Sequence, residues 1–150
     1  MHKLILHTIF QICFVIVTLG QSIDELNRRI ESSTGENKIN YQLTLAYQLM
    51  DIDESRSMSI LDSVLNTHSI SQQNSAKAHY LKATLLYRKN ELNLALADAK
   101  HSLSLYQGKN KSNELVNRSL VALIHEKKKE YNNAIIYYQK NFEEYKKLSD

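Results

Sequence analysis

The 150-residue sequence has one cysteine, three glycines, and neither proline nor tryptophan. Gly20, Gly35 and Gly108 are far apart, so the chain has no glycine-rich loop of the kind that binds phosphate groups. The single cysteine, Cys13, lies inside an apolar run at the start of the chain. A chain without this run forms no disulfide and must be stabilised by apolar burial alone.

The formal net charge is small, +3 for the whole chain. Loss of the first 20 residues, which contain Lys3 and no acidic residue, lowers it to +2. A charge this small gives no electrostatic basis for binding nucleic acid. We therefore expect no nucleic-acid partner.

Catalytic and metal-binding patterns are also missing. The histidines after the apolar run are scattered, and none has a second ligand at the spacing of a zinc site on one helix. No nucleophile, base and orienting residue can be assembled from the sequence. The basic run 127–129 is bracketed by Glu126 and Glu130, which favours a solvated turn over a basic patch. We expect a non-enzymatic protein with no cofactor and no metal.

Residues 1–20 have the plan of a secretory signal peptide. His2 and Lys3 form a basic start, residues 4–19 are mostly apolar, and Thr18 and Gly20 provide small residues before a cut at Gln21. The alternative is an uncleaved membrane anchor, for which the apolar run is short. Cleavage would leave no membrane span and would place the mature protein in the periplasm or outside the cell.

The rest of the chain repeats itself at an offset of 39 residues. Residues 83–103 read ATLLYRKNELNLALADAKHSL, and residues 122–142 read ALIHEKKKEYNNAIIYYQKNF. A weaker copy lies upstream, in residues 45–49 and 57–65. Small residues recur at two places in the copies: Ala46 and Ser57, Ala83 and Ala95, Ala122 and Ala134. A period of this length predicts a solenoid of helix pairs, in which no single unit can bury its apolar face alone.

This pattern resembles the tetratricopeptide repeat over about residues 38–147. The small residues above match the family's eighth and twentieth positions, where helices cross closely. The later family positions are occupied by Leu61, Ala99 and Tyr138 at the twenty-fourth and by Val64, Ser102 and Asn141 at the twenty-seventh. The missing Trp and Pro, and a period longer than the usual 34 residues, depart from the family. The resemblance implies an all-α fold, a right-handed α-solenoid of about three antiparallel helix pairs, with repeats at about 38–67, 75–107 and 114–147 in a domain spanning 38–150.

We expect the two ends of this domain to differ in how their apolar residues are covered. In the stretch 21–37 we expect a short helix, whose apolar face would cover repeat one, followed by a loop at 32–37. The members of that face are Ile23, Leu26 and Ile30. At the other end the last helix has no obvious cover over Ile136, Tyr137 and Phe142. We therefore expect self-association or docking through the carboxy-terminal helix.

The family resemblance also implies a binding surface. In tetratricopeptide repeats the first helix of each unit lines a concave groove. The residues that map onto it and form the predicted partner site are Tyr47, Lys77, Tyr80, Thr84, Tyr87, Arg88, Ser119 and Leu123. The tyrosines offer contact area, and Lys77 and Arg88 can hold a carboxylate. The alternative is a merely solvated groove, with binding elsewhere on the molecule.

The sequence therefore predicts an exported, non-catalytic scaffold that binds a protein or peptide. Its layout resembles the amino-terminal repeat region of exported sensors and regulators of Bacteroidetes-type bacteria. The alternative function is accordingly the sensory input region of a signalling protein, a sensor kinase or transcriptional regulator, as a fragment or a stand-alone relative.

Overall fold

A computed structural model describes residues 22–149, and within this range the regular elements are all helices. A helical segment at 22–32 is followed by six longer helices. They are α2 (Gly35–Leu49), α3 (Glu54–Leu65), α4 (Gln72–Arg88), α5 (Leu92–Tyr106), α6 (Lys111–Lys127) and α7 (Tyr131–Ser149). The predicted signal peptide, residues 1–20, lies outside the described residues.

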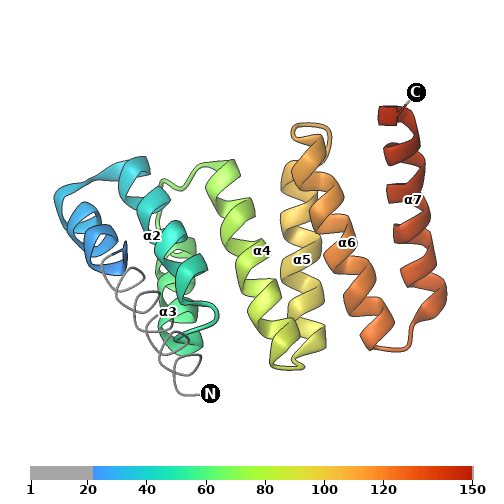
Figure 1. Ribbon diagram of the computed structural model, residues 1–150, viewed down its shortest axis with the longest axis horizontal. Coiled ribbons are helices and arrows are strands. Elements are labelled where there is room, and N and C mark those ends of the chain that lie inside the picture. Colours follow the sequence, from blue (N-terminus) through green and yellow to red (C-terminus); the bar gives the residue numbers. More distant parts are fainter. Residues whose placement is uncertain (1–21, 150) are drawn as a thin grey trace, which may run out of the picture.

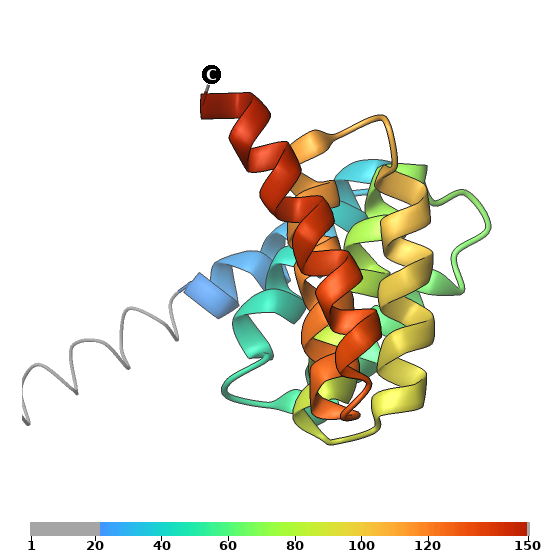
Figure 2. The same ribbon diagram turned by 90° about the vertical axis from the view of Figure 1, so that its right-hand side faces the viewer.

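Successive helices form antiparallel pairs, α2 with α3, α4 with α5 and α6 with α7, and the pairs stand side by side along the long axis (Figure 1). Seen from the carboxy-terminal end, α7 crosses in front of α6 (Figure 2). Each of these helices contacts only helices one or two places along the chain. The protein is thus an all-α solenoid, in which each pair is stabilised by its neighbours.

The 39-residue offset recurs in the hydrogen bonds between paired helices. Ser102 Oγ donates to the carbonyl oxygen of Ala76 at 2.6 Å. At the equivalent positions of the next unit, Asn141 Nδ2 donates to the carbonyl oxygen of Leu115 at 3.0 Å. Each bond joins the second helix of a unit to the first, and each donor is buried. A serine in one unit and an asparagine in the next therefore form the same hydrogen bond between paired helices.

The tight turns inside the last two units also repeat. Asn90 and Lys129 both adopt φ 63°, in the left-handed region. The amides that follow, of Glu91 and Glu130, each donate to a carbonyl oxygen five residues back and so close the first helix of the unit. Asparagine tolerates this conformation better than lysine does, so the strain is larger at Lys129.

The small residues of the repeat pattern are buried where the helices pack. This holds for Ala46, Ser57, Ala83, Ala95, Ala122 and Ala134. In the first unit Ser57 Oγ also donates to the carbonyl oxygen of Ala46, at 2.7 Å. Tyr138 departs from the pattern: its counterparts Leu61 and Ala99 are buried, whereas Tyr138 is 38 % exposed. In the described residues no later helix packs on α7 to cover it.

The first helix of each unit begins three residues before the predicted start of the repeat, at 35, 72 and 111. The residues just ahead are Thr34, Ser71 and Asn110. The side chains of Ser71 and Asn110 accept hydrogen bonds from the amides three residues on. An apolar pattern cannot mark these boundaries because the first helical turn is polar, whereas a capping side chain fixes where the helix begins.

The amino-terminal segment packs as expected, but the loop after it is shorter. Leu26 is buried with Leu45 and Leu49, and Ile23 and Ile30 pack against this cluster. The predicted loop at 32–37 is wrong in length, since only residues 33–34 interrupt the helices. The first turn of α2 is held by Glu36, which accepts hydrogen bonds from Ser71 and, at 2.7 Å, from Asn74 Nδ2. These contacts from α4 explain why polar residues near Gly35 are helical.

The exposed face of α7 also differs from the prediction. Ile136 and Phe142 are exposed as expected, but Tyr137 is not left open. Its ring stacks on His125 of α6 with centroids 5.6 Å apart and packs against the core between α4, α5 and α6. Ala134 and Asn141 are buried on the same side. This packing fixes the rotation of α7 about its axis.

Candidate partner-binding groove

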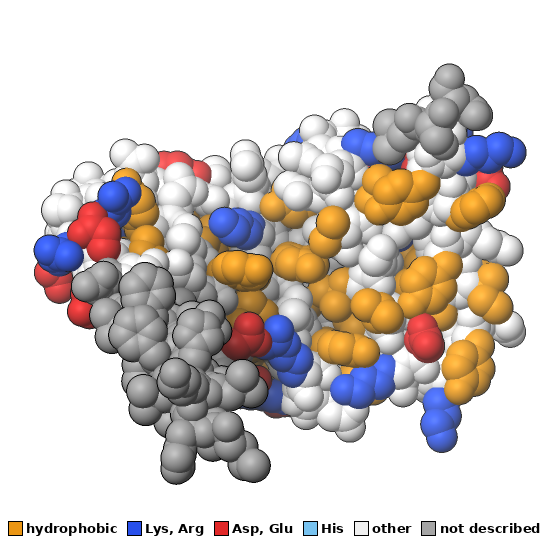
Figure 3. Space-filling model, viewed as in Figure 1, with side chains coloured by type: hydrophobic (Ala, Val, Ile, Leu, Met, Phe, Trp, Pro, Cys, Tyr) orange, Lys and Arg blue, Asp and Glu red, His pale blue; other side chains and the backbone are white. Residues whose placement is uncertain are grey.

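The first helices of the units, α2, α4 and α6, form one face of the solenoid, and two adjoining hollows lie along it. Each has a volume of about 360 Å³, and Tyr80 and Val116 line both. We call the two hollows together the groove. The space-filling view shows hydrophobic side chains gathered across this face and over α7 (Figure 3).

All of the predicted site residues line the groove. Tyr47, Lys77 and Tyr80 line the first hollow. Tyr80 also lines the second, together with Thr84, Tyr87, Arg88, Ser119 and Leu123. The structure therefore places residues from three helices, which are up to 76 positions apart in the sequence, on one surface.

The first hollow holds the polar groups with spare bonding capacity. The side chain of Lys77 is exposed and forms no ion pair or hydrogen bond with the described residues. Asn117 is 2 % exposed and donates through Nδ2 to the carbonyl oxygen of Asn113 at 2.8 Å. Its Oδ1 is the single buried side-chain oxygen or nitrogen in residues 22–149 that lacks a partner. An exposed cation thus lies in this hollow, beside a buried amide oxygen that solvent does not reach.

The second hollow is mainly apolar, and its threonine and serine hydroxyls, of Thr84 and Ser119, bond within the protein. Thr84 Oγ1 donates to the carbonyl oxygen of Tyr80 at 2.9 Å. Ser119 Oγ donates to the carbonyl oxygen of Leu115 at 3.1 Å and accepts from Asn141 Nδ2 at 2.8 Å. These residues therefore shape the hollow, while its tyrosines, Val116 and Leu123 supply contact area.

Arg88 is engaged in a way that the sequence did not predict. Its Nη1 donates to Asp51 Oδ1 at 2.6 Å and to the carbonyl oxygen of Met50 at 3.1 Å. A partner carboxylate at Nη1 would have to displace Asp51, and one at the other nitrogens would lie beside this acidic side chain. Lys77 is therefore the better candidate to hold such a group, and Arg88 instead ties α4 to the turn after α2.

Lys127, the last residue of α6, contacts Tyr87, which lines the second hollow. Its Nζ lies 4.5 Å from the centroid of the Tyr87 ring and donates to the carbonyl oxygen of Tyr87 at 2.9 Å. The neighbouring Lys128 pairs with Glu130 at 2.9 Å. The lysine run at the turn is thus engaged locally, as expected of a turn and not of a basic patch.

Several lining residues were missed by the sequence analysis. They are Gln73, Leu81, Tyr106, Asn113, Asn117, Leu120 and Tyr145. Tyr106 and Tyr145 come from second helices, α5 and α7, which the repeat pattern assigns to the other face. The spacing of Asn113, Val116, Leu120 and Leu123 places them on one side of α6, a signal that was present in the sequence.

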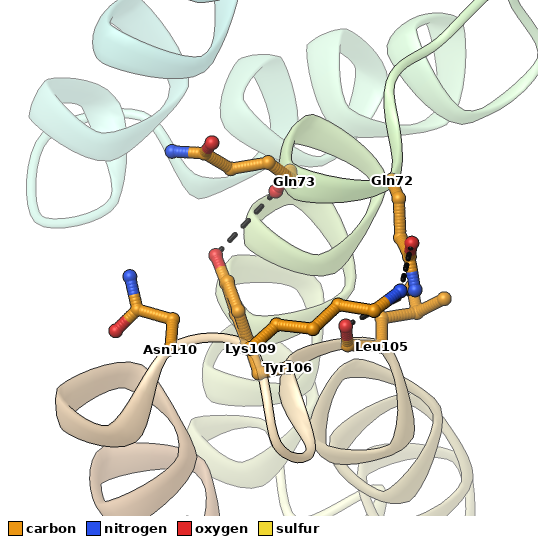
Figure 4. A pocket seen from close by; sticks show the side chains of 6 residues that line it. All are labelled: Gln72, Gln73, Leu105, Tyr106, Lys109 and Asn110. Atoms are coloured by element: carbon orange, nitrogen blue, oxygen red, sulfur yellow. Dashed lines mark hydrogen bonds between the residues drawn. The ribbon is translucent and has the colours of Figure 1, made fainter.

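A third hollow of about 240 Å³ adjoins the first and shares Gln73 and Tyr106 with it (Figure 4). Gln72 Nε2 donates to the carbonyl oxygen of Leu105 at 3.1 Å, and Lys109 Nζ donates to Gln72 Oε1 at 2.5 Å. Tyr106 Oη donates to the carbonyl oxygen of Gln73 at 3.4 Å, and burial raises the pKa of its phenol. These bonds tie the start of α4 to the end of α5 and to the turn that follows it.

Two features of the described part of the chain bear on other functions. In residues 22–149 no three acidic, histidine or cysteine side chains are grouped so that they could hold a metal ion. None of the helices in that range has the length and hydropathy needed to span a membrane.

The fold and its groove define an α-helical repeat protein. No protein-family model matches the chain, and no curated protein matches it. Among solved structures it is similar to the crystal structure of MamA, at 15 % identity and a TM-score of 0.44, over 85 % of this chain and 88 % of that chain.

Proposed function

We propose that the protein is a non-catalytic binding module whose groove holds a segment of a protein partner. The observation that supports this most is the composition of the first hollow. Tyr47, which is 63 % exposed, lies there with Lys77, whose exposed side chain forms no ion pair with the described residues. A peptide would supply apolar side chains for the ring and a carboxylate for Lys77.

The shape of the groove also suits a chain segment better than a compact small molecule. The two hollows adjoin at Tyr80 and Val116 and are open to solvent along α4 and α6. Small-molecule sites are usually enclosed cavities that bury most of the ligand. We infer that the partner lies along the first helices, with apolar side chains in both hollows and an acidic group near Lys77.

Point variants test this proposal with peptides selected from a random library against the whole protein. Tyr47→Ala and Lys77→Ala should each weaken binding about fivefold or more, which is about 1 kcal/mol. Both side chains are exposed, so the fold should be unaffected. Leu94→Ala and Lys100→Ala are the controls, because these exposed residues of α5 do not line the groove. Equal loss from groove and control variants, or no loss from either, would exclude the groove as the site.

We also propose that the protein is exported and acts in the periplasm or outside the cell. The apolar start of the sequence supports export, and sequencing the amino terminus of secreted material should begin near Gln21. A protein that still begins at Met1 and sediments with membranes would favour the anchored alternative. A sensory input role would instead require that the reading frame continue into a signalling domain.

A further inference from the structure

Helix α7 has a second apolar face beside the one that packs on α6. Its side chains are between 38 and 67 % exposed and follow each other at alternating intervals of four and three residues. We call this face the α7 stripe, formed by Tyr131, Ile135, Tyr138, Phe142 and Tyr145. Figure 3 shows hydrophobic side chains gathered over α7. The alternating interval is the one at which two helices pair along a narrow seam.

The stripe is nearly palindromic about Tyr138. From either end it reads tyrosine, then one large apolar residue, then the central tyrosine. If two copies of α7 pair in opposite directions, Tyr131 lies opposite Tyr145, Ile135 opposite Phe142, and Tyr138 opposite its own copy. A surface that complements itself in this way fits a closed two-fold dimer, in which the same patch is used twice.

The charges on α7 favour the antiparallel direction. Residues 131–139 carry no charge, and the charged side chains all follow them. They are Lys140, Glu143, Glu144, Lys146 and Lys147. An antiparallel pair places each charged half beside the uncharged half of the other copy, whereas a parallel pair places like charges side by side.

At the opposite end of the solenoid, the described residues offer no apolar surface of this kind. The segment 22–32 covers repeat one and leaves Asp24, Arg28, Arg29 and Glu31 exposed. Arg28 and Arg29 pair there with Glu25, at 3.2 and 2.8 Å. Stacking of copies end to end would set this charged surface against the apolar stripe. The two ends therefore do not complement each other, and an open filament is disfavoured.

We propose that the α7 stripe binds the α7 stripe of a second copy, in an antiparallel dimer centred on Tyr138. Large side chains at these exposures present roughly 500 Å² per copy, or about 1,000 Å² for the pair. This is the lower limit for a specific interface and corresponds to a weak, reversible dimer. Because Tyr145 also lines the groove, dimerisation would restrict that end of the groove and compete with a partner.

Sedimentation velocity of the whole protein, from low to high micromolar concentration, tests the proposal. The wild type should pass from monomer to dimer, and Phe142→Glu should weaken the dimer at least about tenfold, since each dimer loses two side chains. Leu94→Glu is the matched control, because Leu94 is 58 % exposed on α5 and lies outside the stripe. A wild type that stays monomeric throughout, or a control that acts as strongly as Phe142→Glu, would overturn the proposal.

Cysteine cross-linking in a Cys13→Ser background tests the direction of pairing. In the antiparallel dimer Tyr138→Cys should oxidise to a covalent dimer. Phe142→Cys should not, since the two copies of residue 142 would lie about 12 Å apart along the helices. A mixture of Ile135→Cys and Phe142→Cys should cross-link. Equal self-cross-linking at 138 and 142 would refute the antiparallel arrangement.

These outcomes are separable from those for the groove. Phe142 does not line either hollow, so Phe142→Glu should bind selected peptides at least as tightly as the wild type, and more tightly where the wild type is dimeric. A protein that loses dimerisation and keeps peptide binding supports both proposals. One that binds peptide but never dimerises leaves the proposed function standing and removes the dimer.

Discussion

Ala95 provides the sharpest test of the packing that creates the groove. It is fully buried on α5 in a cluster with Ala83, Ala99 and Val121. Three small side chains at this contact let α4 and α5 approach closely, and α4 in turn carries most of the predicted groove residues. A leucine at position 95 would add three heavy atoms where no solvent-accessible space exists. Helices on both sides, α4 and α6, limit any relief by movement.

We expect Ala95→Leu to lower the free energy of unfolding by about 1 to 3 kcal/mol, the usual cost of overpacking. Ala97→Leu is the matched control, because Ala97 is exposed on the same helix. The same substitution there should change stability by less than about 0.5 kcal/mol. Urea unfolding followed by circular dichroism measures both. If Ala97→Leu is as destabilising as Ala95→Leu, burial of the repeat's small residues does not stabilise the solenoid.

Two further predictions concern the turn between α6 and α7. Lys129→Gly should stabilise the protein by up to about 1 kcal/mol in urea unfolding, because glycine adopts the φ of 63° without strain; an equal gain from Asn90→Gly would contradict this reason. Hydrogen bonds from Lys128 and His125 lower the pKa of Glu130 from 4.5 to about 2. Glu130 therefore stabilises the fold above about pH 4.5, and this stabilisation is lost as the pH falls toward 2. Glu130→Gln should be less stable than the wild type at neutral pH and equally stable near pH 2; a difference independent of pH would refute the assignment.

The burial of the helix pairs could be anticipated because small residues recur at a fixed offset. Ala83 and Ala122 lie in equivalent places, and steric exclusion at a close helix contact allows little else there. The position of the groove could be predicted from the same repeat positions, since the first helices of successive units share one face. These features depend on the spacing of residues along the chain, which can be read from the sequence.

Other features depend on contacts between distant residues and could not be read from spacing. Arg88 meets Asp51, 37 positions away, only after two units have stacked. Tyr145 reaches the groove because α7 is rotated by the packing of Tyr137 on His125. The starts of the first helices were missed for a different reason: α4 and α6 each begin at a single polar cap, and α2 is held by contacts of Glu36 with Ser71 and Asn74, none of which has an apolar signal in the sequence.

The α7 stripe shows where the repeat pattern stops being informative. In the last unit Tyr138 occupies a position that is buried in both earlier units. Its hydroxyl donates a hydrogen bond to Glu126 of α6 at 2.9 Å. Burial and this bond raise its pKa to about 12. A residue that belongs to the core in one unit is thus available for an interface in another.

The central claim is that the groove formed by α2, α4 and α6 holds a segment of a protein partner. Chemical-shift mapping tests it most directly, using isotope-labelled protein and a peptide selected against it. Shifts should concentrate at Tyr47, Lys77, Tyr80 and Asn117 and should spare the outer faces of α3 and α5. Shifts confined to α3, α5 or the segment 22–32, with the groove residues unchanged, would contradict the account.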